Sequence, residues 1–248
     1  MAKIAAIFVA VAPVTAGGRG KPFAKVEGRE VFMRTIELYT HRDHVGQKVM
    51  VVGVDDLETM QQRYGAHLGF QGVSVTAGGP DWFGAVGRAL EKLKPEYDTV
   101  IVHDVCRPAV PYTLLDALDE AAEKVAAVAP VVAIGGSLAR VSGGANGGGI
   151  GGALDAVVDS VGLFEVQSPQ VFRRSVLEEA YAKRAGIKAV DDADLVRQCG
   201  VKVLAIAGST YNVRVDSDEM VKLAGDYLGH MPKPRPKGPI TPFDEAQW

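Results

Sequence analysis

Two charged side chains with a fixed spacing follow an apolar run near the middle of the chain. Residues 99–102 are β-branched and largely apolar, which is typical of a strand buried on both faces of a parallel sheet. Asp104 and Arg107 come directly after this run. Ligands of open α/β sheets bind at the carboxyl ends of strands, so the carboxylate could hold a divalent cation and the guanidinium a phosphate. The same spacing would also arise if Asp104 capped a turn and Arg107 paired with it.

A glycine-rich segment with two basic residues follows the first apolar run of the chain. It begins at Pro13, contains Gly17, Gly18 and Arg19, and reaches Lys21. Its backbone N–H groups and two cations could hold a triphosphate. The segment matches neither G-x-x-x-x-G-K-[ST] nor G-x-G-x-x-G. Glycine-rich turns with a basic residue also occur as plain connections, so both interpretations stay open.

The composition limits the class of protein. A chain of 248 residues with 47% apolar and 23% charged residues can bury the core of one α/β domain. A formal net charge of -3 argues against a nucleic-acid-binding function. The apolar residues 4–14 are too few to span a bilayer, and Cys106 and Cys199 match no disulfide framework or zinc pattern. We therefore expect a cytoplasmic protein with no nucleic-acid or membrane partner.

Apolar runs and helical periodicities alternate along the chain, which predicts an α/β fold with a doubly wound, mostly parallel sheet. The predicted strands are residues 4–11, 48–54, 72–76, 99–104, 127–134 and 201–206. The predicted helices are residues 31–39, 57–64, 82–93, 113–125, 174–185, 191–199 and 217–228.

Two segments fall outside this alternation. Seven of the ten residues 143–152 are glycine, which favours a mobile loop, and the flanking runs could pair as a protruding β-arm over residues 138–158. Residues 230–248 form a proline-rich tail. We therefore predict a single domain over residues 1–229, with the arm, followed by the tail.

Three ordered motifs resemble one enzyme family. They are His-Asp-Val-Cys-Arg-Pro at 103–108, Gln-Ser-Pro-Gln-Val-Phe at 167–172 and Asn-Val-Arg-Val at 212–215. With these motifs the chain resembles a divergent member of the 2-C-methyl-D-erythritol 4-phosphate cytidylyltransferase family, nucleotidylyltransferases of glycosyltransferase-A-like fold. The resemblance implies a transferase of the isoprenoid precursor pathway. Such an enzyme uses Mg²⁺ to join CTP to a small phosphorylated polyol, releases pyrophosphate and forms a homodimer through the arm.

The resemblance also assigns roles to individual residues. Attack of one phosphate on another gathers negative charge that cations and a metal must neutralise. The implied catalytic cations are Arg19, Lys21 and Arg214. The implied nucleotide-binding residues are Pro13, Gly17, Gly18, Gly79 and Asp104, of which Asp104 would also hold the metal. The implied acceptor-binding residues are Arg107, Ser137, Arg140 and Ser168.

Several positions depart from the family pattern. Arg214 stands where the family has a lysine, and Ser160 replaces an arginine of the arm. The run from Trp82 to Val86 replaces a segment that helps to recognise the nucleotide, so we expect loose base selectivity, with Trp82 as a stacking face and Ala85 without a polar group. Trp82 could equally cover the sheet edge. These departures leave open a second hypothesis, a catalytically silent relative with a binding or regulatory role.

Two further groups of residues have structural interpretations. His103 precedes the candidate metal ligand and is expected to hydrogen-bond at the strand end rather than act as a base. Asp191, Asp192 and Asp194 could suggest a metal site. Acidic residues are favoured at the start of a helix, so we interpret this cluster as a helix cap.

Overall fold

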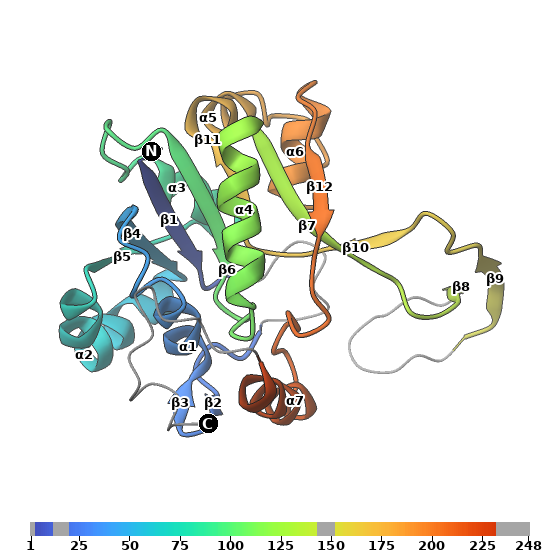
Figure 1. The fold of residues 1–248 in the computed structure, drawn as a ribbon, viewed down its shortest axis with the longest axis horizontal. Helices are drawn as coiled ribbons and strands as arrows, with labels where there is room; N and C mark the ends of the chain where they lie inside the picture. Colours follow the sequence, from blue (N-terminus) through green and yellow to red (C-terminus); the bar gives the residue numbers. More distant parts are fainter. Residues whose placement is uncertain (1–2, 12–19, 143–151, 232–248) are drawn as a thin grey trace, which may run out of the picture.

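An eight-stranded sheet forms the centre of the computed structural model, which describes residues 3–11, 20–142 and 152–231 (Figure 1). Its strands are β1 (Ile4–Val9), β4 (Val45–Val52), β5 (Val73–Ala77), β6 (Thr99–Asp104), β7 (Ala127–Ala133), β10 (Phe164–Val166), β11 (Gln170–Arg173) and β12 (Leu204–Ala207). The helices are α1 (Val31–Glu37), α2 (Val54–Phe70), α3 (Trp82–Leu90), α4 (Tyr112–Lys124), α5 (Arg174–Ala182), α6 (Asp192–Gln198) and α7 (Asp218–His230).

Helices cover both faces of this sheet, and the side chains of β1 explain why. All six residues of β1 are buried, and successive strand residues point to opposite faces. Ala6 and Phe8 belong to the cluster that packs against α1, α2 and α4. Ala5 and Ile7 belong to the cluster that packs against α3, α5 and α6, which lie behind the sheet in Figure 1. The doubly wound α/β fold is thereby confirmed.

The sheet is mostly parallel. Its strand order is β10-β7-β11-β6-β1-β4-β5, and β12 pairs with β7. The pairs β1–β4, β1–β6, β4–β5 and β12–β7 are parallel. The short strands β11 and β10 are antiparallel to their neighbours, and β11 lies between β6 and β7. These two strands escaped the sequence analysis because three or four residues show little periodicity.

Element boundaries differ from the predictions by several residues. Strand β4 begins at Val45 instead of residue 48, and α2 extends through Phe70 although Gly65 and Gly69 interrupt its pattern. The hairpin β2 (Lys25–Val26) and β3 (Arg29–Glu30) had not been predicted. It packs against α7, whose last residue, His230, lies one residue into the expected tail.

The predicted arm is present as an antiparallel hairpin of β8 (Leu138–Val141) and β9 (Leu154–Val158). Figure 1 shows it projecting sideways, away from the sheet. The glycine-rich loop between these strands, at 143–151, and the tail from residue 232 lie outside the described residues. Among the helices of the described ranges, none combines the length and apolar character needed to cross a membrane.

Candidate active site

A cavity of about 470 Å³ lies beyond the carboxyl end of β1. This is the edge of a parallel sheet at which ligands of α/β proteins bind. The described residues that line it come from five separate segments of the chain: Ala10, Val11, Gly20, Lys21, Pro22, Phe23, Ala24, Asp56, Cys106, Arg214 and Asp218. Its charged groups include two of the predicted catalytic cations, Lys21 and Arg214.

A buried ion pair joins the end of β6 to this cavity. Arg214 Nε donates a 2.7 Å hydrogen bond to Oδ2 of Asp104, whose side chain is only 4% exposed. The other oxygen of Asp104 accepts a 2.9 Å hydrogen bond from the backbone N–H of Cys106. Burial alone would lower the pKa of Arg214, but the Asp104 carboxylate outweighs it and the pKa is raised. The guanidinium is therefore a permanent cation at the cavity wall.

Three segments are held together around this pair by backbone contacts. The N–H of Lys21 donates to the carbonyl of Val215, and the N–H of Val215 donates to the carbonyl of Cys106. Gly20 lies so close that a Cβ there would be 2.3 Å from Cys106 Sγ and 2.8 Å from Arg214 Nη2. Only glycine fits without a shift of its neighbours.

Lys21 forms the second cationic group of the cavity. Its Nζ lies 2.6 Å from Oδ1 of Asp218, at the start of α7, and the two side chains are 36% and 81% exposed. The hydrogen bond from Lys21 lowers the pKa of Asp218, so this carboxylate is ionised at neutral pH. Exposed pairs of this kind are weak, so an incoming phosphate can replace Asp218 as the partner of Lys21.

Arg107 and Ser168 form a buried network behind the cavity instead of lining it. Arg107 Nη1 donates to the carbonyl of Asn212 at 2.7 Å, and Nη2 lies 3.1 Å from Oε1 of Glu165. Ser168 Oγ accepts a 2.8 Å hydrogen bond from the N–H of Asp104. Asp104 does cap a turn through the N–H of Cys106, but it also pairs with Arg214, whereas Arg107 pairs with Glu165 and not with Asp104. The acceptor-binding role of Arg107 and Ser168 stays a prediction.

The remaining predicted site residues lie in three places. Ser137 and Arg140 are exposed near the base of the arm and on β8, and neither is among the residues lining the cavity. Gly79 lies in the turn before α3, where a Cβ would be 2.7 Å from Gly84 Cα. Pro13, Gly17, Gly18 and Arg19 lie outside the described residues.

Trp82 was given two open interpretations, stacking on a base or covering the sheet edge, and the structure gives it a buried packing position. Trp82 is 5% exposed and packs in the core, where its Nε1 donates a 2.7 Å hydrogen bond to Asp192. Ala85 is fully buried. Neither residue is among those that line the cavity at the carboxyl end of β1, so the expected loss of base selectivity has no support at these two positions.

The helix-cap interpretation of the acidic cluster holds for Asp191, whereas His103 bonds a partner away from the strand end. Asp191 caps α6 by accepting a hydrogen bond from the N–H of Asp194. His103 is fully buried and its Nδ1 lies 2.9 Å from the hydroxyl of Tyr39, which follows α1 rather than belonging to the strand end. Burial lowers the pKa of His103 to about 3, so the ring is neutral and sealed from any reacting group.

The described residues contain no cluster of three or more His, Cys, Asp or Glu side chains that could hold a metal. Asp104 is a single carboxylate, and each of its oxygens accepts one hydrogen bond and keeps a lone pair. Mg²⁺ is commonly bound through one or two carboxylates together with substrate phosphates. Asp104 is 4% exposed and is not among the residues that line the cavity, so it can supply one oxygen at most and the other ligands of a Mg²⁺ ion would come from the phosphates of a nucleotide.

The sequence analysis missed four residues that shape the site: Gly20, Cys106, Glu165 and Asp218. Gly20 and Cys106 are adjacent to assigned positions, but their mutual contact depends on the folded loop. Asp218 lies 197 residues from its partner Lys21. Its only local signal is a helix start, because Ser217 caps α7.

Solved structures share this architecture. One titled 4-diphosphocytidyl-2C-methyl-D-erythritol synthase is 25% identical and superposes with a TM-score of 0.75, covering 92% of this chain and 99% of its own. The 2-C-methyl-D-erythritol 4-phosphate cytidylyltransferase from Thermus thermophilus is 27% identical, with a TM-score of 0.71, covering 90% of this chain and 98% of its own. Fold and site together define an α/β protein of the nucleotide-sugar transferase type.

Sequence comparison narrows this class. The family model described as IspD, 2-C-methyl-D-erythritol 4-phosphate cytidylyltransferase, matches residues 10–230. A cytidylyltransferase of that name from Solibacter usitatus is 30% identical over 216 residues, which are 86% of each chain. One from Frankia casuarinae is 34% identical over 194 residues, 78% of this chain and 68% of the relative. The chain belongs to the 2-C-methyl-D-erythritol 4-phosphate cytidylyltransferase family.

Proposed function

We propose that this chain is an active cytidylyltransferase that joins CTP to 2-C-methyl-D-erythritol 4-phosphate and releases pyrophosphate, in the supply of isoprenoid precursors. The observation that carries the proposal is the cavity at the carboxyl edge of the sheet, where Arg214 and Lys21 meet in a chain of this family. Both cations are ion-paired in this structure, and a ligand with several phosphates can take the place of Asp218, the exposed partner of Lys21.

The reaction requires charge stabilisation more than proton transfer. An oxygen of the acceptor phosphate attacks the α-phosphorus of CTP, and the bond from that phosphorus to the β-phosphate oxygen breaks as pyrophosphate leaves. Arg214 is fixed by Asp104 before the substrate arrives, so little reorganisation is needed when charge develops. Lys21 exchanges its exposed partner, Asp218, for the triphosphate.

Asp104 is the residue we propose for Mg²⁺, together with the phosphates of the nucleotide. The ion would supply further positive charge to the triphosphate. Among the described residues, the buried network of Ser168, Asn212 and Arg107 holds Asp104 and the segment of Arg214 in place. Through these contacts the three sequence motifs act together on one carboxylate and one cation.

Two features of the environment belong to the same proposal. Cys106 and Cys199 are free thiols, which supports function in a reducing, cytoplasmic compartment. The exposed apolar side chains of the arm support a homodimer. Ser137 and Arg140 lie apart from the cavity of their own chain. In a dimer they could bind the acceptor at the cavity of the partner subunit.

Release of pyrophosphate from CTP with Mg²⁺ and the methylerythritol phosphate tests the proposal directly. We expect turnover by the natural chain and a loss of about 10²–10³ in kcat/KM for Arg214→Met, the usual range for removing one transition-state charge contact. Arg63→Met is the matched control, because Arg63 lies on α2 over the ring of Tyr64. Raised thermal stability with CTP but no pyrophosphate release would instead support the catalytically silent relative.

A further inference from the structure

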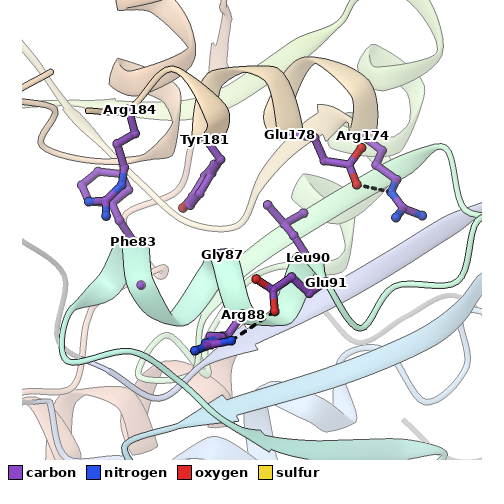
Figure 2. Close-up of a pocket in the computed structure, with 10 residues that line it drawn as sticks. Phe83, Gly87, Arg88, Leu90, Glu91, Arg174, Glu178, Tyr181 and Arg184 are labelled. Carbon is purple, nitrogen blue, oxygen red and sulfur yellow. Dashed lines mark hydrogen bonds and ion pairs between the residues drawn. The ribbon is translucent and has the colours of Figure 1, made fainter. Parts of the chain in front are cut away.

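A second cavity, of about 420 Å³, lies between α3 and α5 on the back face of the sheet (Figure 2). Its volume is within the range of small-molecule sites. It shares no described lining residue with the cavity at the carboxyl edge of β1. The described residues that line it are Phe83, Gly84, Gly87, Arg88, Leu90, Glu91, Arg174, Glu178, Tyr181 and Arg184.

Half of the residues that line this α3–α5 groove are charged, and its apolar part comes from Phe83, Leu90 and Tyr181. Gly87 leaves the surface of α3 bare beneath the ring of Tyr181, which would lie 3.5 Å from a Cβ at that position. The Tyr181 hydroxyl turns away to donate a hydrogen bond to the buried carboxylate of Asp192. The half-buried ring of Tyr181 offers most of the apolar surface between the helices, and the buried side chains of Phe83 and Leu90, 6% and 5% exposed, border it (Figure 2).

The arginines around the groove differ in how many hydrogen-bond and ion-pair partners they have. Arg174 donates hydrogen bonds to Glu178 and to two backbone carbonyls, so it has few N–H groups left for a ligand. Arg88 lies 3.4 Å from Glu91, and the two side chains are 64% and 63% exposed. Such an exposed pair contributes little and can exchange partners.

Among the arginines that line the groove, Arg184 is the one whose guanidinium has no protein acceptor among the described residues. Its guanidinium lies over the ring of Phe83, 5.3 Å from the centroid. An arginine stacked on an aromatic ring keeps its N–H groups directed outward in its plane, where they match a carboxylate or a phosphate. The groove thus carries one unpaired positive charge beside an apolar floor.

We propose that the α3–α5 groove binds a small anion attached to a flat apolar ring. The anionic group pairs with Arg184, Arg88 stands on the opposite helix, and the ring packs against Phe83, Leu90 and Tyr181 (Figure 2). Carboxylates and phosphate monoesters share the necessary chemistry. This site is additional to the proposed reaction, which takes place in the other cavity.

Phenyl phosphate is a suitable probe, titrated into the full chain by isothermal calorimetry. We expect saturable binding that weakens at least tenfold in Arg184→Met, a change that keeps the side-chain length and removes the charge. Arg63→Met, the other described arginine over an aromatic ring, should bind as the natural chain does. Benzyl alcohol has only the ring and inorganic phosphate only the anion, so both should bind more weakly than phenyl phosphate. Benzoate, which has both a ring and an anion, should bind as phenyl phosphate does.

Three results would overturn the proposal. The first is the absence of binding at millimolar phenyl phosphate. The second is equal binding by Arg184→Met and the natural chain. The third is displacement of phenyl phosphate by CTP together with an affinity that Arg184→Met leaves unchanged. That result would place the bound phenyl phosphate in the cavity of Lys21 and Arg214. Unchanged circular dichroism of Arg184→Met would exclude misfolding as the cause of a lost signal.

Discussion

Gly20 sets how closely the first loop approaches the cation of the site. The space that a Cβ would need is filled by Cys106 Sγ and by one terminal nitrogen of Arg214. The arginine end could move, but the sulfur is buried and held by the backbone of a packed turn. The position of Arg214 therefore depends on an absent side chain as much as on its partner Asp104.

We expect Gly20→Ala to destabilise the fold by about 1–3 kcal/mol, the usual cost of overpacking, and to weaken CTP binding because Arg214 must shift. Adding Cys106→Ala removes the sulfur and should restore part of both losses. Gly65→Ala is the control, since nothing lies within 4 Å of a Cβ there, and alanine is preferred in a helix. Urea unfolding and CTP titration measure both effects, and a double variant no better than Gly20→Ala would contradict the argument.

At the scale of single residues, the sequence predicted the types of group at the site better than their partners. Asp104 could be placed because an apolar run ends there, and the structure ends β6 at that residue. The partner of Arg107 could not be placed, because Glu165 lies 58 residues away and comes close only through β10. The interpretation of Trp82 stayed open for the same reason, since its partner Asp192 is 110 residues distant.

At the scale of elements, the long buried strands and the helices could be predicted from periodicity, whereas the order of the sheet could not. Strand β11 has four residues and gains its place by pairing with β6 and β7 on either side. Such pairing is a tertiary contact that no local pattern specifies. The hairpin of β2 and β3 likewise depends on packing against α7.

A buried carboxylate joins three of the helices on the back face. Asp192, at the start of α6, accepts hydrogen bonds from Trp82 on α3 and from Tyr181 on α5. Burial raises the pKa of Asp192 to about 6, despite these hydrogen bonds, from an ordinary value of 3.8. The folded protein therefore binds a proton here in a pH range where the unfolded chain does not.

The sign of the resulting pH dependence follows from linkage. Between pH 3.8 and 6 the folded state holds the extra proton, so the contribution of Asp192 to stability falls as pH rises through this window and stays low above it. Burial of His103, with its pKa lowered to about 3, acts in the opposite direction over an overlapping range. A comparison with Asp192→Asn isolates the carboxylate, because His103 is common to both proteins.

We expect the advantage of the natural chain over Asp192→Asn in free energy of unfolding to be about 1–2 kcal/mol larger at pH 5 than at pH 7.5. Urea unfolding at the two pH values measures this difference. Asp55→Asn, an exposed acidic residue in the first turn of α2, serves as a control for loss of a carboxylate at a helix start. A difference between the natural chain and Asp192→Asn that does not change with pH would show that Asp192 is ionised throughout.

At the scale of the whole molecule, exposed apolar side chains are concentrated in one region. Of the 13 large apolar residues that are exposed in the described part of the chain, eight lie between residues 141 and 166, on the arm and the segment that returns from it. Monomeric proteins rarely expose contiguous apolar patches of this kind. A two-stranded hairpin is also only marginally stable alone in water.

One face of the arm is apolar, as the pairing of its two strands shows. Ala139 pairs with Val157 and Val141 with Leu154, and paired residues share a face of a hairpin. The residue skipped at the register shift, Asp155, is in β9, so β8 alternates regularly and Ala139 and Val141 point to the same side. These four side chains form an apolar surface, which a second copy of the chain can cover in the same way.

We therefore expect a homodimer that Leu154→Asp with Val157→Asp converts to a monomer, because the two carboxylates would be buried unpaired in the interface. Light scattering at tens of micromolar should give twice 26.2 kDa for the natural chain and 26.2 kDa for this variant. Phe70→Asp is the matched control, since Phe70 is 93% exposed at the end of α2, away from the arm, and its replacement should leave the dimer intact. If Arg140 serves the partner's cavity, the monomer will also lose cytidylyl transfer while it still binds CTP. A natural chain of 26.2 kDa, or a dimer that survives both aspartates, would show that the arm has another role.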